Sequence, residues 1–86
     1  MKLKRGLIMR EIAGEYVVLA AGDEVELKGM ITLNETGATL WKKLEEGAEL
    51  SDLTAALLAE YDVDESIAAV HAEAFADRLK ELALLD

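Results

Sequence analysis

The sequence contains no cysteine and a single histidine, His71. Without cysteine, the chain cannot form disulfides, zinc-thiolate sites, iron–sulfur clusters or a thiol nucleophile. One histidine cannot build a multi-histidine metal site, and His71 has no Ser partner at a spacing typical of nucleophilic catalysis. We expect His71 to pack against neighbouring side chains or to line a groove. The sequence therefore predicts a protein that is not an enzyme and that has no cofactor.

Motifs for phosphate, calcium and phosphopantetheine are missing as well. Gly37 stands alone inside an expected helix, so there is no glycine-rich phosphate loop. The acidic run at residues 62–65 has neither the glycine nor the spaced ligands of a calcium loop, and it is typical of a helix start. Ser51 lies between Leu50 and Asp52, which is not the Asp-Ser-Leu order of an acyl carrier.

The chain also lacks a long apolar run. Its first residues, MKLKRGLIMREI, reach Arg10 and Glu11 after three apolar residues, so we expect neither a secretory signal nor a membrane span. A cytoplasmic location is the resulting expectation.

Basic residues are scarce in the second half of the chain. The net charge is −9, and residues 1–43 carry seven basic and six acidic side chains, whereas residues 44–86 carry two basic and twelve acidic ones. Because nucleic-acid binding depends on Lys and Arg side chains that neutralise phosphates, this distribution argues against DNA or RNA as a partner. We expect a neutral or cationic peptide or protein instead.

The composition that remains fits one globular domain over residues 1–86. A chain of this length buries only about 60 to 65% of its unfolded surface and cannot support two cores, and 52% of its residues are hydrophobic. The first third is rich in β-branched and large apolar residues. It predicts strands over residues 7–12 and 16–20, with turns near residues 13–15 and 22–23.

Residues 24–33 alternate in polarity with a period of two, as in a strand with one buried face. The residues expected on the core face are Val25, Leu27, Ile31 and Leu33. Met30 and Thr32 would point to the opposite side, and Gly29 marks an expected bulge or break.

A change to helical spacing follows at Asn34. Asn34 is the expected N-cap, with its side chain accepting from the backbone N–H of Thr36 or Gly37, and Gly47 ends this helix. The apolar residues at helical spacing are Ala38, Leu40, Trp41 and Leu44.

Two more helices are predicted after Gly47. The second has Ser51 as its expected N-cap and finishes near Tyr61, with an apolar face of Leu53, Leu57 and Leu58. The third runs from a cap at Asp64 to about Leu82. Three strands followed by three helices predict an α+β fold.

The third helix carries more apolar surface than one core requires. Its apolar side chains sweep roughly 200°, about twice the ~100° stripe of a helix packed on one side. The side expected to face the core holds Ala68, Ala72, Phe75, Leu79 and Leu82. The other side holds Ile67, Val70, His71, Ala74 and Arg78. Either this helix is deeply buried, or its second side forms a groove with the strand at residues 24–33 and binds an extended peptide by strand addition.

Three segments resemble the PqqD-like family over nearly the whole chain: MITLNETGATLW (residues 30–41), AEYDVDE (59–65) and FADRLKELALL (75–85). The most specific part is LNETGA with Trp41. Ala83 departs from the family, whose members often end the last helix with Gly. The resemblance implies a winged helix-turn-helix-like fold, with a three-stranded antiparallel sheet followed by three helices.

The resemblance also implies a function in the maturation of ribosomally synthesised and post-translationally modified peptides (RiPPs). The protein would be a non-catalytic adaptor that binds the leader of a precursor peptide as a strand added to strand three, beside helix three. It would present the peptide to a modifying enzyme, often a radical S-adenosylmethionine (SAM) maturase. The implied peptide-binding residues are Val25, Glu26, Leu27, Lys28, Met30, Ile31, Thr32, Leu33, Ile67, Val70, His71, Ala74 and Arg78.

Two other functions stay open at this point. A winged-helix DNA-binding regulator would need a basic recognition helix, whereas the second and third helices are acidic on balance. A simple dimerisation module is the other alternative, because exposed strand edges also pair with each other. The sequence thus allows either a monomer or a homodimer.

Overall fold

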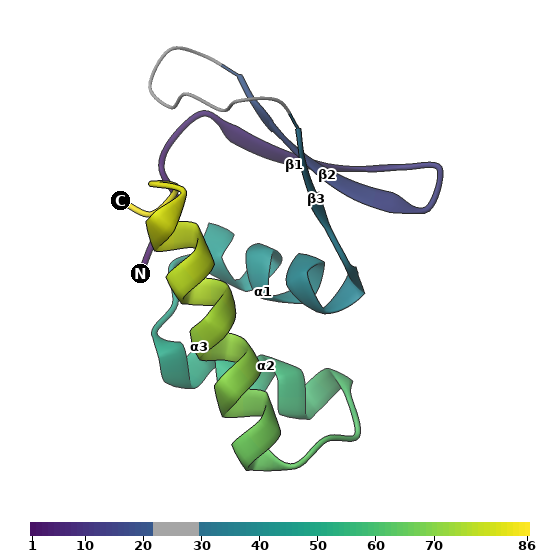
Figure 1. Ribbon diagram of the computed structural model, residues 1–86, viewed down its shortest axis with the longest axis vertical. Coiled ribbons are helices and arrows are strands. Elements are labelled where there is room, and N and C mark those ends of the chain that lie inside the picture. Colours follow the sequence, from purple (N-terminus) through teal and green to yellow (C-terminus); the bar gives the residue numbers. More distant parts are fainter. Residues whose placement is uncertain (22–29) are drawn as a thin grey trace.

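The structure, a computed structural model, describes residues 1–21 and 30–86 and has the predicted α+β fold (Figure 1). The strands are β1 (Leu7–Ile12), β2 (Glu15–Ala20) and β3 (Ile31–Leu33). The helices are α1 (Glu35–Glu45), α2 (Leu50–Glu60) and α3 (Glu65–Glu81). The strands form one antiparallel sheet in the order β1-β2-β3, and α1 lies between this sheet and α2.

The β1–β2 hairpin turns through two residues with left-handed backbone angles. Ala13 has φ 53° and Gly14 has φ 83°, and the flanking residues Ile12 and Glu15 are paired. Two successive residues with positive φ are typical of a tight type I′ loop, whose twist matches that of the strands. The predicted turn is confirmed, with Glu15 already part of β2.

The register of β3 gives it the predicted inner and outer faces. Its pairs with β2 are Leu33–Tyr16, Thr32–Val17 and Ile31–Val18. Leu33 is buried and Ile31 packs half-buried against the core, whereas Thr32 is exposed and Met30 is 66% exposed. The predicted turn at residues 22–23, the strand at residues 24–29 and the bulge at Gly29 lie outside the described residues.

Asn34 converts the strand into α1, as predicted. Its backbone is extended, and its side-chain Oδ1 accepts a hydrogen bond of 2.7 Å from the Gly37 N–H. The helix ends before Gly47, which has φ 83°. The predicted apolar face of α1 is entirely buried: Ala38, Leu40, Trp41 and Leu44.

The core lies between the inner face of the sheet and the helices. Its largest fully buried side chains are Val18, Leu40, Trp41, Leu44, Leu53, Leu79 and Leu84. Burying each such aliphatic side chain contributes about 1.5–3 kcal/mol. Leu84 reaches the core because the two ends of the chain run side by side: Leu3 bridges to Leu85, and the Lys4 N–H donates to the Leu84 carbonyl at 2.9 Å.

The start and the apolar face of α2 differ from the prediction. Glu49 rather than Ser51 is the N-cap, because Glu49 forms a capping box with Asp52, whose carboxylate accepts from the Glu49 N–H at 2.8 Å. The helix therefore begins at Leu50, and the prediction of Ser51 was wrong. Leu58 is 40% exposed rather than part of the core, because no helix or strand of the described residues covers that side of α2.

α3 has the predicted extent, from Asp64 as N-cap to Leu82 as C-cap, but the Asp64 side chain makes no hydrogen bond to the helix. Its buried residues are Ala68, Ala72, Ala76 and Leu79, with Phe75 half-buried. Leu82 is 41% exposed, which contradicts its expected core position. The physical reason is that the chain leaves the helix at Leu82 and returns Leu84 to the core instead.

The end of α3 adopts a Schellman motif. Ala83 has φ 58°, its N–H donates to the Lys80 carbonyl at 3.0 Å, and the Leu84 N–H donates to the Leu79 carbonyl at 2.9 Å. The motif packs Leu84 back against Leu79. A left-handed conformation costs a residue with a Cβ atom about 1–2 kcal/mol, so Ala83 is strained.

Ala83→Gly should therefore stabilise the protein. We expect the free energy of unfolding to rise by about 0.5–1 kcal/mol in urea titrations, since glycine adopts this conformation without the Cβ penalty but adds freedom to the unfolded chain. The control is the reverse exchange at the end of α1, Gly47→Ala, where a Cβ would meet nothing closer than 3.6 Å. It should destabilise by a similar amount, and a stabilising Gly47→Ala would contradict the argument.

Asn34→Ala should lower the free energy of unfolding by about 1 kcal/mol, because the Gly37 N–H loses its acceptor. Asp64→Ala is the matched control, since Asp64 occupies the same N-cap position in α3 without a side-chain hydrogen bond. Measurements at high salt screen the interaction of the Asp64 charge with the helix dipole. Under these conditions Asp64→Ala should lower the free energy of unfolding by less than half as much as Asn34→Ala. Equal losses in the two variants would show that the Asn34 hydrogen bond is not the source of stability.

Candidate functional site

β3 lies at the edge of the sheet. β2 pairs with one side of β3, and no strand of the described residues pairs with the other. An unpaired edge presents backbone N–H and C=O groups that an added strand can bind. In Figure 1, β3 runs toward α1 in roughly the opposite direction to α3.

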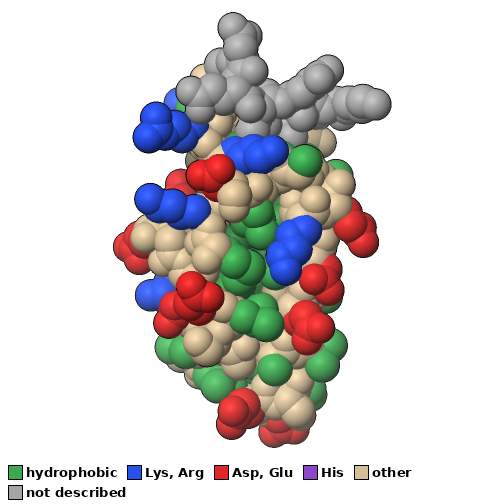
Figure 2. All heavy atoms as spheres, turned by 90° about the vertical axis from the view of Figure 1, so that its left-hand side faces the viewer, with side chains coloured by type: hydrophobic (Ala, Val, Ile, Leu, Met, Phe, Trp, Pro, Cys, Tyr) green, Lys and Arg blue, Asp and Glu red, His purple; other side chains and the backbone are tan. Residues whose placement is uncertain are grey.

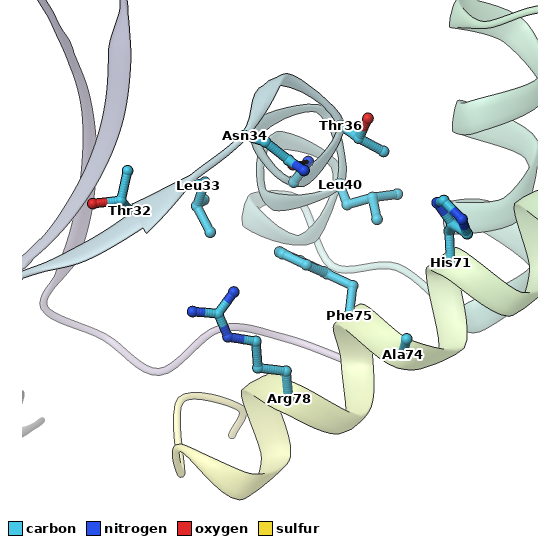
Figure 3. Close-up of a pocket in the computed structure, with 10 residues that line it drawn as sticks. Thr32, Leu33, Asn34, Thr36, Leu40, His71, Ala74, Phe75 and Arg78 are labelled. Atoms are coloured by element: carbon cyan, nitrogen blue, oxygen red, sulfur yellow. Dashed lines mark hydrogen bonds between the residues drawn. The ribbon is translucent and has the colours of Figure 1, made fainter.

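A groove of about 560 Å³ lies between β3, the first two turns of α1, and α3 (Figure 3). Buried Leu33 and Leu40 contribute apolar surface to it. Figure 3 shows the Phe75 ring directed from α3 toward α1, and the Arg78 guanidinium reaching from α3 toward β3. The complete lining is Thr32, Leu33, Asn34, Thr36, Gly37, Leu40, His71, Ala74, Phe75 and Arg78.

Gly37 allows α1 and α3 to approach each other beside this groove. A Cβ atom on Gly37 would lie 3.1 Å from Asn34 Oδ1, 3.3 Å from Phe75 Cε1 and 3.4 Å from Leu33 Cβ. The two carbon–carbon separations, to Phe75 and Leu33, are shorter than the optimum of about 3.5–4.0 Å for non-bonded carbon atoms. A side chain at Gly37 would therefore push the Phe75 ring away from α1 and change the shape of the groove.

Five of the predicted peptide-binding residues line the groove: Thr32, Leu33, His71, Ala74 and Arg78. Ile67 lies in an adjoining small cavity, and Met30 and Val70, which is 64% exposed, lie outside the lining. Ile31 points to the core. The other four predicted residues, Val25, Glu26, Leu27 and Lys28, lie outside the described part of the chain.

The groove also contains residues that the sequence reasoning did not assign to it: Asn34, Thr36, Gly37, Leu40 and Phe75. Two signals in the sequence point to them. At about 100° per residue, Phe75 lies only about 40° around α3 from His71, on the border between the two apolar sides. A glycine in the first turn of a helix, as at Gly37, is a sign of close approach by another element.

A smaller cavity of about 120 Å³ adjoins the groove, between the end of α2 and the start of α3. Its walls are mainly apolar and include Leu57, Tyr61, Val63 and Ile67. The Tyr61 hydroxyl is hydrogen-bonded to Thr39 Oγ1 at 3.0 Å, so its polar group already has a partner. Thr36 and His71 line both spaces, which makes the cavity and the groove neighbours along α3.

Charge is unevenly distributed around the groove. Its ionisable lining residues are His71 and Arg78, and Arg78 makes no ion pair with residues 1–21 or 30–86. At the other end of α3, the α2–α3 connection carries exposed Asp62 and Asp64, and α3 begins with exposed Glu65. On the face seen in Figure 2, the charged side chains at that end of the molecule are acidic, and the basic ones lie nearer the sheet.

The described residues contain no group of three or more His, Asp or Glu side chains positioned to hold a metal ion. A search of the same residues finds no helix with the length and apolar character needed to cross a membrane.

The fold is similar to those of two solved structures. One match is TbiB1 in complex with the TbiA(beta) leader peptide, with 27% sequence identity, a TM-score of 0.79, and coverage of 100% of this chain and 95% of that chain. Another is lasso peptide synthetase B1 complexed with the leader peptide, with 24% identity, a TM-score of 0.72, and coverage of 93% and 89%. At that lower identity the likeness bears on the fold alone.

No curated protein matches the sequence. The family described as Coenzyme PQQ synthesis protein D (PqqD) matches residues 15–85. This match spans most of the sheet, all three helices and every residue that lines the groove. The chain belongs to the PqqD family.

Proposed function

We propose that this protein is a non-catalytic adaptor of a RiPP pathway, which binds the leader of a precursor peptide and presents it to a modifying enzyme. The observation that carries this proposal is the open groove between α3 and the edge of β3 with which no described strand pairs. Membership of the PqqD family supports it, as does the likeness to TbiB1, whose structure holds a leader peptide.

Binding of an extended peptide in the groove would combine two contributions. The first is hydrogen bonding to the edge of β3, at about 1 kcal/mol net for each bond. These bonds alone do not offset the cost of ordering a short peptide. The second is apolar burial: the half-buried Phe75 and the exposed Ile67 and Val70 on α3 offer apolar surface whose burial by a peptide would supply the additional stabilisation that tight binding needs.

The proposed contact residues differ in their place relative to the groove. Thr32, Leu33, His71, Ala74 and Arg78 form the centre of the binding site. Met30 and Val70 lie at its margins, Ile67 lies in the adjoining cavity, and Ile31 supports the strand from the core side.

The groove lining also supports a binding function over a catalytic one. Its two ionisable residues are His71 and Arg78, and an Arg side chain stays protonated in proteins and cannot act as a general base. The peptide modification itself would be the reaction of a partner enzyme such as a radical SAM protein. In our proposal the adaptor acts in the cytoplasm, as a monomer or a homodimer.

The alternative functions receive less support. A DNA-binding regulator would present basic residues on α2 or α3, whereas the charges of α3 are mainly acidic: Glu65, Glu73, Asp77, Arg78, Lys80 and Glu81. A dimerisation module would not require a groove whose wall holds Arg78, a cation without an ion pair among the described residues.

Titration of isotope-labelled protein with the leader of a precursor encoded beside its gene tests the proposal directly. We expect the amide resonances of residues 31–33 and 67–78 to shift, because the peptide would lie between β3 and α3. A scrambled peptide of the same composition is the control. Shifts confined to α2, or equal shifts with the scrambled peptide, would contradict leader recognition at this groove.

Ala74→Glu should weaken leader binding by about tenfold or more, equivalent to at least about 1.4 kcal/mol. Ala74 is exposed and lines the groove, so a longer charged side chain there would occupy the peptide's space without disturbing the core. Ala55→Glu, the same substitution at an exposed position of α2, is the matched control and should leave affinity unchanged. Fluorescence anisotropy gives both affinities, and circular dichroism checks that both variants are folded. Equal affinities for the two variants would place the peptide elsewhere.

A further inference from the structure

The adjoining cavity is apolar and the groove contains a charged side chain. This difference in polarity affects which peptide sequences the site would select. The cavity is apolar and small, whereas the far end of the groove holds the guanidinium of Arg78. The following inference rests on the proposed function, because it assigns a sequence preference to the same site.

The cavity has the size of one aliphatic side chain. A water molecule occupies about 30 Å³ of liquid, so the 120 Å³ space holds about four non-hydrogen atoms. A leucine or isoleucine side chain has that number of carbons. The walls formed by Leu57, Val63 and Ile67 would cover it with apolar surface.

Arg78 provides a second, charged contact. Its guanidinium extends into the groove toward β3 and makes no ion pair with another described residue (Figure 3). A guanidinium in this position can bind a carboxylate through two parallel hydrogen bonds, which are stronger than those between neutral groups. An Asp or Glu side chain of the peptide is the complementary group.

The distance between these two contacts sets their spacing in the peptide. The cavity is centred between Ile67 and His71, about nine residues before Arg78, which corresponds to about 13.5 Å along the axis of a helix. An extended strand advances about 3.3 Å per residue, so four residues cover about 13 Å. An even separation also directs both side chains to the same side of the strand.

The direction of the sheet sets their order. All strand pairs of the sheet are antiparallel, and β3 runs roughly opposite to α3 (Figure 1). A strand added antiparallel to β3 would run in the direction of α3, from the cavity toward Arg78. The acidic residues Asp62, Asp64 and Glu65 near the cavity would repel a carboxylate at that end, which favours the same order.

We infer that the site selects leader peptides in which an aliphatic residue is followed four positions later by Asp or Glu. The aliphatic side chain occupies the cavity beside Ile67, and the carboxylate binds Arg78. The acidic balance of the helical half favours neutral or basic residues at the other positions of the segment.

Selection from a library of random twelve-residue peptides displayed on their own mRNA tests this preference. The wild-type protein should enrich peptides with an aliphatic residue and an acidic residue four positions later, with Asp or Glu favoured over Lys at the second position by about tenfold. Arg78→Glu should abolish or reverse the acidic preference and keep the aliphatic one. Ile67→Asn should remove the aliphatic preference and keep the acidic one.

Lys80→Glu is the matched control for Arg78→Glu, because it makes the same change of charge on the opposite side of α3 and should leave both preferences intact. Two outcomes would overturn the inference and leave the proposed function standing. In the first, the enriched peptides shift amides of β3 and α3 on binding, but their sequences lack this pattern. In the second, the Arg78→Glu variant keeps the acidic preference. Enrichment of no peptide, or of peptides that shift other residues, would overturn both.

Discussion

The hydrogen bond from the Gly37 N–H to Asn34 Oδ1 fixes the point at which the strand becomes a helix, and the arrangement of the groove depends on it. Leu33 is the last residue of β3 and is buried, so the cap immediately after it orients α1 relative to the sheet. This sets Leu40, three residues beyond Gly37, under the groove. The same glycine leaves space for Phe75, so one short segment both orients α1 and admits α3.

α3 combines two kinds of contact through its choice of side chains. Three of its buried residues are alanines, Ala68, Ala72 and Ala76, which let the helix approach its neighbours closely. Phe75 and Arg78 then extend on the side facing β3, where they line the groove. Small residues on one side and long ones on the adjacent side therefore explain why a helix of a compact domain leaves an open groove instead of closing it.

Local rules in the sequence were sufficient for much of this structure. The alternation around Ile31 and Leu33, the cap at Asn34 and the helix end at Gly47 each depend on a few neighbouring residues, and the structure confirms them. The errors concern positions where two local solutions compete or where tertiary packing decides. Ser51 and Glu49 are both plausible caps, and the reciprocal bond with Asp52 selects Glu49. The chain reversal at Ala83 exposes Leu82 and buries Leu84. The groove lining comes from three elements, and the polarity pattern within one element does not predict how the three are placed relative to one another.

The edge of β3, which pairs with no strand in the described part of the chain, affects how the protein behaves in solution. An exposed edge that accepts a peptide also accepts the same edge of another copy, which is the usual origin of unwanted association in β-proteins. This chain carries a net charge of −9, because residues 44–86 contribute −10 and residues 1–43 contribute +1. Two copies that approach each other therefore experience repulsion over about 8 Å at physiological ionic strength. The acidic residues would thus keep the strand edge vacant for a partner of different charge.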